Sequence, residues 1–339
     1  MMSAARRRAA HAAEVAVRPL RRLDVAIQTM RWSPHSRLFV LGEGSGWSVD
    51  EDAVTIARTA ESLGAVVGPG NWAPFSRSQV VFHTSQFAAV DSRWLRSSHR
   101  LGMAYLHGRP GTSGYPEFDR VFEAVSADPR RFDRIQVTHR EMEELALEAG
   151  VDATRVFHIP IGVDIESFPL ADDASRAAAR DRLGLPGTAF VVGSFQKDGV
   201  GWEDGLEPKL IKGPDVLLAA AERLRERVPE LHVLLTGPAR GFVSRGLERL
   251  GVPYRHVLLD DLDGVAEAYR ALDVCLVTSR DEGGPKAVLE SMATGVPLVT
   301  TRVGQATDLV RHGENGYLVD VGDAEGIAEW TARVAAAPA

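Results

Sequence analysis

The chain of 339 residues is longer than one hydrophobic core usually supports, which predicts two domains. Hydrophobic residues make up 45% and charged residues 25%, as is typical of globular proteins, and the net charge of -7 argues against nucleic acid as a partner. The only cysteine, Cys275, excludes an intramolecular disulfide and favours a reducing compartment.

The first 33 residues are predicted to be a flexible N-terminal extension. They are rich in alanine and arginine, and they contain no apolar run long enough for a membrane span or a secretory leader. We therefore expect a cytoplasmic protein. The arginines leave open a peripheral contact with the inner face of a membrane.

Residues 34–165 are predicted to form an N-terminal domain in which strands and helices alternate. Short apolar runs predict strands, and longer amphipathic runs predict helices. This alternation is typical of a parallel sheet flanked by helices. The expected strands are 37–41, 79–83 and 101–107, and the expected helices are 50–64, 116–126 and 138–150.

A stretch rich in proline, glycine and charge then predicts a linker at 166–186, followed by a C-terminal domain at 187–339. Ligands of parallel α/β sheets bind at the carboxyl ends of the strands, so the cleft between two such domains is the expected site. The strands expected in the second domain are 189–195, 231–237, 255–260, 274–279 and 296–301, with helices at 213–229, 241–251, 264–273 and 285–295.

The stretch "SRDEGGPKAVLESMATGVP", residues 279–297, carries the clearest chemical signal. Gly283 and Gly284 precede a short helix with Pro285 expected at its first position, and a glycine-flanked helix start can bind a phosphate through its amides. Glu290 lies about 7.5 Å further along the helix axis, a distance that suits a nucleotide ribose. The alternative remains that Glu282 is only a favourable acid before a helix and that Glu290 is solvated.

This stretch, with "VGQATDLVRHGENGYLV" after it, resembles the donor-binding half of retaining GT-B glycosyltransferases of family 4. The E-x7-E motif of that family falls on Glu282 and Glu290. The resemblance implies an α/β GT-B fold, with two facing Rossmann-like domains and a cleft between them. It also implies metal-independent transfer of a sugar, with retention, from a nucleoside diphosphate sugar to an acceptor hydroxyl. That donor is a co-substrate and no cofactor is expected; the acceptor would be a glycan, a lipid-linked sugar or a small molecule.

The resemblance also assigns roles by position. Glu282 would bind donor-sugar hydroxyls, Glu290 the ribose, and Lys212 the departing diphosphate. The family has an arginine where this chain has Ser194, and Lys197 is the suggested substitute. The implied donor-binding residues are Glu290, Gly283, Gly284, Pro285, Lys286, Lys212, Gly193 and Ser194.

By the same resemblance, the first domain would be the acceptor-side Rossmann-like domain, and it would add a histidine and a glycine-rich loop. His107, directly after a predicted strand, resembles the active-site histidine of the family, with His83 as its competitor and Arg109 nearby. The loop with Gly42, Gly44 and Gly46 would approach the phosphates and the acceptor, unless it is simply a flexible loop.

Other functions stay open at this point. Sugar-nucleotide epimerases, sugar phosphate synthases and non-catalytic sugar-nucleotide-binding proteins share the architecture. Asp261 and Asp263 imitate the metal-binding D-x-D of GT-A transferases, but we expect a loop and helix-cap cluster and no metal site. The alternative of an NAD-dependent oxidoreductase is supported only by "GEGSG", whose glycine spacing does not fit the dinucleotide-binding fingerprint. The sequence does not determine the donor base, the acceptor or the oligomeric state.

Overall fold

A computed structural model describes residues 37–44, 48–92, 98–259 and 261–337 of the chain. The chain divides into two compact units: the first runs to Val137 and includes Met142–His158, and the second comprises Thr138–Glu141 and everything from Ile159 onward. Residues 159–186, which the sequence divides between the first domain and a linker, therefore pack with the second unit. The predicted N-terminal extension lies outside the described residues.

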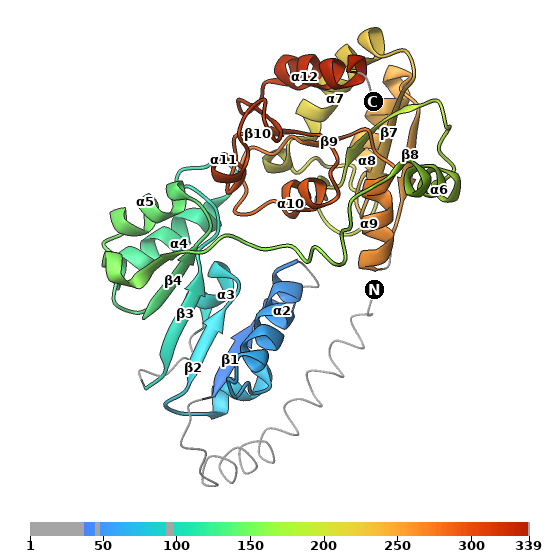
Figure 1. Cartoon of the computed structure of the whole chain (residues 1–339). Coiled ribbons are helices and arrows are strands. Elements are labelled where there is room, and N and C mark those ends of the chain that lie inside the picture. Colours follow the sequence, from blue (N-terminus) through green and yellow to red (C-terminus); the bar gives the residue numbers. More distant parts are fainter. Residues whose placement is uncertain (1–36, 45–47, 93–97, 260, 338–339) are drawn as a thin grey trace. The chain divides into compact units, whose positions relative to one another are not determined.

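The first unit contains a five-stranded parallel sheet in the order β1-β2-β3-β4-β5 (Figure 1). Alternate strand residues such as Phe39, Val81 and Met103 point into a core that they share with α4 and α5. The strands are β1 (Leu38–Leu41), β2 (Val80–His83), β3 (Arg100–Ala104), β4 (Arg134–Val137) and β5 (Val156–His158). The helices that accompany them in sequence are α2 (Ser48–Ser62), η1 (Gly70–Phe75), α3 (Gln86–Asp91), α4 (Pro116–Ala127), α5 (Arg140–Glu148) and η2 (Ala153–Arg155).

The second unit contains a six-stranded parallel sheet in the order β11-β10-β9-β6-β7-β8. From β6 the chain adds β7 and β8 on one side, then returns to place β9 on the other side of β6. The order therefore reverses between β6 and β9, where doubly wound sheets bind their ligands. The strands are β6 (Phe190–Ser194), β7 (Leu231–Thr236), β8 (Tyr254–Val257), β9 (Val274–Val277), β10 (Leu298–Thr301) and β11 (Tyr317–Val319).

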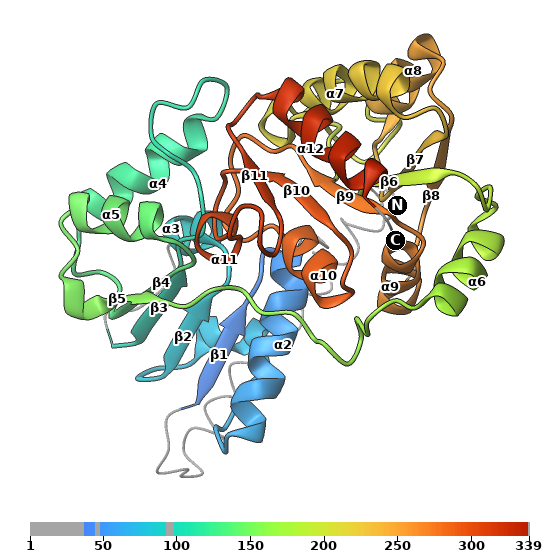
Figure 2. The same ribbon diagram turned by 45° about the horizontal axis from the view of Figure 1, so that its top comes forward.

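Helices cover both faces of this second sheet (Figure 2). Val274 and Leu276 of β9 pack in a cluster with α7, α8 and α12, whereas Cys275 and Val277 pack in the opposite cluster with α6, α9 and α10. Burial on both faces explains why β9 is continuously apolar. The helices are α6 (Asp173–Leu183), η3 (Leu210–Lys212), α7 (Pro214–Arg227), α8 (Gly241–Leu250), α9 (Leu262–Arg270), α10 (Lys286–Ala293), α11 (Ala306–Leu309) and α12 (Ala324–Ala336).

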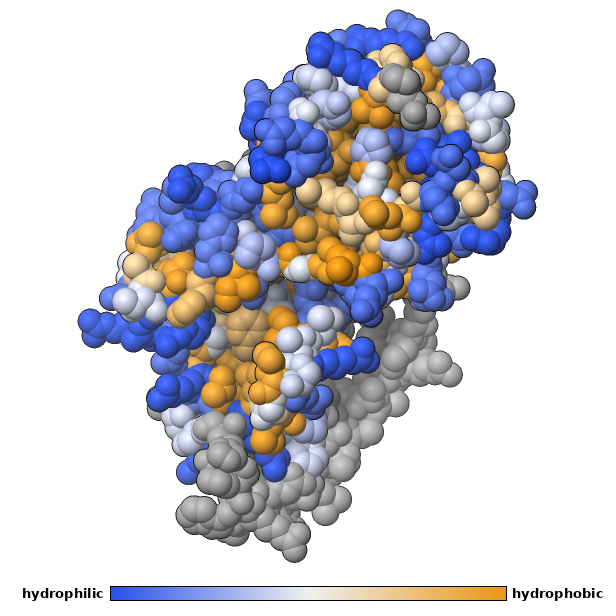
Figure 3. Space-filling view, viewed as in Figure 1, coloured by the Kyte–Doolittle hydropathy of each residue, from blue (hydrophilic) through white to orange (hydrophobic). Residues whose placement is uncertain are grey.

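The outer helices of the second unit are amphipathic. The residues around α7 and α12, at the top of the space-filling view, are mostly hydrophilic (Figure 3). Among the described residues, none of the helices combines the length and the apolar character that crossing a membrane requires.

Candidate nucleotide-sugar site

The reversal point of the second sheet is bridged by two polar side chains. Gln196 follows β6 and Ser279 follows β9, and the Gln196 amide donates a hydrogen bond to the Ser279 hydroxyl. Both side chains are buried. The carboxyl ends of β6 and β9 are thus joined where a ligand of this fold is expected.

Glu282 lies at the same point and accepts several hydrogen bonds through one oxygen. Its Oε1 is 2.6 Å from the Lys212 ammonium and 2.8 Å from the Ser279 hydroxyl, with the Gln196 amide at 3.4 Å. The Lys212 and Glu282 side chains retain only 24% and 13% of their exposed area. An ammonium has three donors, so Lys212 can hold this carboxylate and still reach a phosphate.

The segment that carries Lys212 is fixed from the other side by Arg280. The Arg280 guanidinium forms two bonds to the Asp215 carboxylate, at 2.8 and 2.7 Å, and one to the Leu210 carbonyl. Its backbone amide also donates to the Ile211 carbonyl at 2.7 Å. Sequence reasoning missed Arg280, although it stands two residues before Glu282 in the stretch already singled out.

The Gly283–Gly284 turn leads into α10 in very little space. A Cβ atom on Gly284 would lie 2.6 Å from Ile161 Cδ1 and 2.9 Å from Gln305 Oε1, so a larger residue would require these two side chains to move. The backbone amide of the buried Gln305 also donates to the Gly283 carbonyl. Pro285 is the N-cap of α10 rather than its first helical residue, one position from our expectation, and Gly295 adopts the expected left-handed conformation after the helix. The first helical residue is Lys286, and the Val288 amide in the first turn donates to the Pro285 carbonyl at 3.0 Å. The positive end of the helix dipole lies at this turn.

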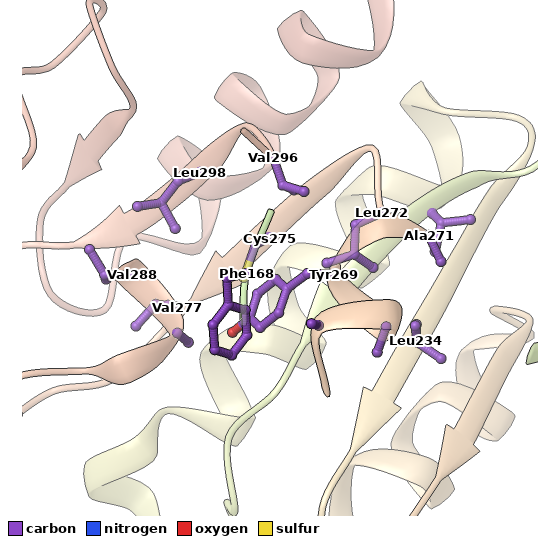
Figure 4. Close-up of a cluster of buried hydrophobic side chains, with 14 of the residues drawn as sticks. Phe168, Leu234, Tyr269, Ala271, Leu272, Cys275, Val277, Val288, Val296 and Leu298 are labelled. Atoms are coloured by element: carbon purple, nitrogen blue, oxygen red, sulfur yellow. The ribbon is translucent and has the colours of Figure 1, made fainter. Parts of the chain in front are cut away.

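Glu290 is held by a tyrosine that the sequence did not reveal. The hydroxyl of Tyr269 donates to Glu290 Oε2 at 2.8 Å. Burial, together with the nearby Glu290 carboxylate, raises the pKa of this phenol well above its usual value of 10.0, so it stays a donor. The Tyr269 ring packs edge-on against Phe195, with centroids 4.7 Å apart. It also lies beside Phe168 (Figure 4), in the apolar cluster to which α10 contributes Ala287 and Val288.

Known families match the part of the chain that carries this site. Residues 205–336 match the model of the family described as "Glycosyl transferases group 1". Most of the second unit is thus similar to a group 1 glycosyltransferase domain. Curated relatives agree: D-inositol 3-phosphate glycosyltransferases of Corynebacterium urealyticum and Xylanimonas cellulosilytica are 30% and 36% identical over 256 and 195 residues, or 70% and 54% of this chain. The matched regions cover 56% and 43% of those two relatives, so the chain spans about half of their length.

Solved structures confirm the GT-B fold over both units. Anabaena HepE in complex with UDP-glucose matches with a TM-score of 0.67, at 19% identity, over 87% of this chain and 88% of HepE. Sucrose-phosphate synthase of Thermosynechococcus elongatus matches with a TM-score of 0.69, at 18% identity, over 89% and 90% of the two chains.

Two predicted donor contacts of the group 1 domain have packing roles in this structure. A Cβ atom on Gly193 would lie 2.3 Å from Leu272, and the Ser194 side chain and carbonyl accept bonds from Arg240. Arg240 is fully buried and ion paired with the buried Asp198 at 3.0 Å. The contacts of Gly193 and Ser194 with a donor stay predictions.

Lys197, the suggested substitute for the family arginine, lies over an aromatic ring. Its ammonium is 4.5 Å from the centroid of Trp202, and burial lowers its pKa from the usual 10.5. Its role at the diphosphate also stays a prediction.

The lysines of the chain lie in the segments of this site or next to them in sequence. The chain has 39 basic residues, but only four of them are lysines, and every other one is arginine. Lys197, Lys212 and Lys286 lie in the segments just described, and Lys209 stands three residues before Lys212. Lysine binds a phosphate as a compact point charge, whereas arginine binds it as a planar fork.

In the first unit, the two candidate histidines occupy different environments at strand ends. His107 follows β3 and packs edge-on against Phe87 and Phe118, with centroids 6.0 and 5.4 Å away, while Gln86 bonds its backbone. His83 ends β2 and is 2% exposed. Burial, with a smaller effect of the Arg131 charge, lowers the pKa of His83 from 6.5 to about 4. Arg109 lies on the exposed turn after His107.

The glycine-rich loop after β1 already holds a carboxylate. The amides of Glu43 and Gly44 donate to Asp50 Oδ1 at 2.7 and 2.9 Å. A Cβ atom on Gly42 would lie 2.1 Å from the same oxygen. The loop therefore has the geometry of an anion site, and a phosphate there would have to displace Asp50. Gly46 lies outside the described residues.

Asp261 acts as the expected helix cap, since its side chain accepts from the Gly264 amide at 2.8 Å at the start of α9. Within the described part of the chain, no group of three or more acidic, histidine or cysteine side chains could hold a metal ion.

Proposed function

We propose that this protein transfers a sugar from a nucleoside diphosphate sugar to an acceptor hydroxyl with retention of configuration and without a metal ion. One observation carries the proposal. Glu282, Lys212 and the glycine-flanked start of α10 meet at the reversal point of a group 1 glycosyltransferase domain. The carboxylate can accept donor-sugar hydroxyls, and the lysine and helix start can stabilise the diphosphate.

In the proposed reaction, the bond between the anomeric carbon and the β-phosphate oxygen breaks as the acceptor oxygen bonds to that carbon from the same face. The acceptor proton passes to the departing phosphate oxygen. Lys212 lowers the barrier because negative charge grows on the diphosphate as it leaves. Glu290, oriented by Tyr269, holds the ribose so that the reacting atoms stay aligned.

Donor binding and turnover test the proposal directly. UDP-glucose, the ligand in the HepE complex, is the first donor to try, with GDP-mannose and ADP-glucose alongside it in a thermal-shift screen. A ligand at 100 times its dissociation constant stabilises a protein by about 2.7 kcal/mol. With the donor identified, Glu282→Gln should lower kcat by about 100-fold or more. Glu222→Gln, an exposed carboxylate on α7, is the matched control and should have no effect. If none of the nucleotide sugars stabilises the protein, the proposal is contradicted.

Metal independence has its own test. Activity should be unchanged in excess EDTA, because lysines and helix amides supply the positive charge at the diphosphate. Loss of activity in EDTA that is restored by manganese would exclude this mechanism.

A non-catalytic sugar-nucleotide-binding protein is the second candidate. It is favoured by the position of Lys197 over Trp202 and by the serine at the place of the family arginine. Donor binding without turnover across a broad panel of acceptors, unaffected by Glu282→Gln, would support it. A sugar phosphate synthase, like the structural neighbour from Thermosynechococcus, would instead be active only with sugar phosphate acceptors.

A further inference from the structure

Residues 198–209 form a hairpin between β6 and α7, which we call the 198–209 hairpin. Gly199 and Pro208 pair as an antiparallel bridge, and the Val200 amide donates to the Glu207 carbonyl at 2.9 Å. At its base the Lys209 amide donates to the Asp198 carbonyl at 2.7 Å. The family match begins only at residue 205, inside the hairpin, so it does not include the first half.

The hairpin is held firmly on the start of α8. Asp198 forms the buried ion pair with Arg240, and the amides of Gly241 and Phe242 donate to the carbonyls of Asp204 and Gly205 at 2.7 and 2.9 Å. A Cβ atom on Gly205 would lie 2.2 Å from the Ala239 carbonyl oxygen. These contacts indicate that the hairpin is an ordered element with a defined surface.

Both ends of the hairpin start beside the proposed catalytic carboxylate. Gln196, two residues before it, and Lys212, three residues after it, both contact Glu282 Oε1. The base of the hairpin therefore lies beside the place where the donor sugar is expected.

The hairpin carries a half-exposed indole and three exposed carboxylates. Trp202 is 51% exposed, with Val200 at 47% and Leu206 at 44%. The Lys197 ammonium lies over the indole ring and favours one ring orientation. Three exposed acidic residues share the hairpin: Glu203, Asp204 and Glu207.

We propose that Trp202 is the platform on which a sugar ring of a neutral glycan acceptor stacks, with the hairpin carboxylates accepting hydrogen bonds from its hydroxyls. The ring of a sugar has an apolar C–H face that suits an aromatic surface and an edge of hydroxyl donors that suits carboxylates. The three carboxylates would repel a phosphorylated acceptor or an anionic membrane. The assignment of this glycan as the acceptor rests on the proposed transferase function.

Binding of defined probes to the full chain tests the proposal. The probes are maltotriose, cellotriose and mannotriose, compared by saturation-transfer NMR with glucose 6-phosphate, mannose 6-phosphate and phosphatidylglycerol vesicles. The variants are Trp202→Ala, Trp202→Phe and, as a matched control, Leu258→Ala, since Leu258 is 68% exposed on the same unit. Thermal stabilisation by the donor is measured on each variant in parallel.

At least one neutral trisaccharide should bind the unchanged protein and Leu258→Ala alike. Trp202→Ala should weaken that binding by about 10-fold, and Trp202→Phe should restore most of it, because one aromatic contact is lost and regained. Donor stabilisation should be the same in the unchanged protein and in Leu258→Ala, and it should persist in both Trp202 variants.

Three results would overturn the inference: no neutral trisaccharide binds, binding does not change in Trp202→Ala, or only sugar phosphates or vesicles bind in a Trp202-dependent way. A different result would contradict the proposed transferase function. Absence of donor stabilisation with intact, Trp202-dependent glycan binding would refute the transferase and leave a glycan site.

Discussion

Tyr269 shows how a residue outside the recognised motif can control a ligand carboxylate. Its hydroxyl donates to Glu290, and its ring is locked between Phe195 and Phe168. The phenol therefore fixes the orientation of the carboxylate that we assign to the ribose. No sequence pattern would link Tyr269 to Glu290, because the two residues lie 21 positions apart on different helices.

Tyr269→Phe should weaken donor binding several-fold while costing only about 1 kcal/mol of folding stability, the usual net value of one hydrogen bond. Calorimetric titration with the donor and denaturant unfolding measure the two effects. Tyr254→Phe, which removes the exposed bond to Glu248, is the control and should leave donor binding unchanged. Equal donor affinity in all three proteins would remove Tyr269 from the site.

His83 predicts a pH dependence of stability that belongs to the first unit. Its pKa is about 4 in the folded protein and about 6.5 when unfolded, so between these values the unfolded chain binds more protons. The contribution of His83 to the free energy of unfolding is fully present above pH 6.5. It decreases as the pH drops toward 4, by about 3 kcal/mol in total.

Urea unfolding of the protein and of His83→Asn at pH 7, 6, 5 and 4 measures this contribution. The difference in unfolding free energy between the two proteins should shrink as the pH falls. A constant difference would mean that His83 titrates normally in the folded protein.

At the scale of elements, the left-handed turn between η3 and α7 positions the lysine of the site. Gly213 has φ of 65°, and a Cβ atom there would lie 1.9 Å from the Thr278 carbonyl oxygen at the end of β9. The close approach of this turn to β9 brings Lys212 to Glu282. Gly251 has the same φ of 65° after α8, but a Cβ atom added there would have no neighbour within 4 Å.

Gly213→Ala should therefore cost about 3 kcal/mol or more and should also lower turnover, because the clash adds to the backbone strain. Gly251→Ala should cost only about 1 kcal/mol of strain and leave turnover intact. Chemical denaturation and steady-state kinetics of the two variants separate the effects. Equal costs would show that β9 and the turn can move apart freely.

Elements with strong local signals could be predicted from the sequence. β9 is an unbroken apolar run because both of its faces are buried, and α10 is marked by proline before it and glycine after it. β4 was missed because four residues, beginning with an exposed arginine, do not form a clear pattern. Arg280 and Arg240 were missed because their roles come from partners more than 40 positions away, Asp215 and Ser194, which only the fold brings near.

At the scale of the whole molecule, donor binding should protect one unit in particular. The proposed contacts lie in residues 193–213 and 279–293, both in the second unit. Hydrogen exchange with and without the donor should slow in these two segments. Protection confined to residues 37–158 would place the nucleotide in the first unit and contradict the assignment.

The concentration of lysines has a practical consequence for anyone handling the protein. Apart from the terminal amine, every primary amine of the chain lies in a segment of the proposed donor site or in the 198–209 hairpin, while the arginines elsewhere do not react with acylating reagents. Biotinylation or sensor coupling through amines would therefore attach to the site itself. Thiol coupling would have to use Cys275, which is fully buried, so an added tag is the safer anchor. Conversely, the rate at which a mild acylating reagent modifies Lys212 would report directly whether a ligand occupies the site.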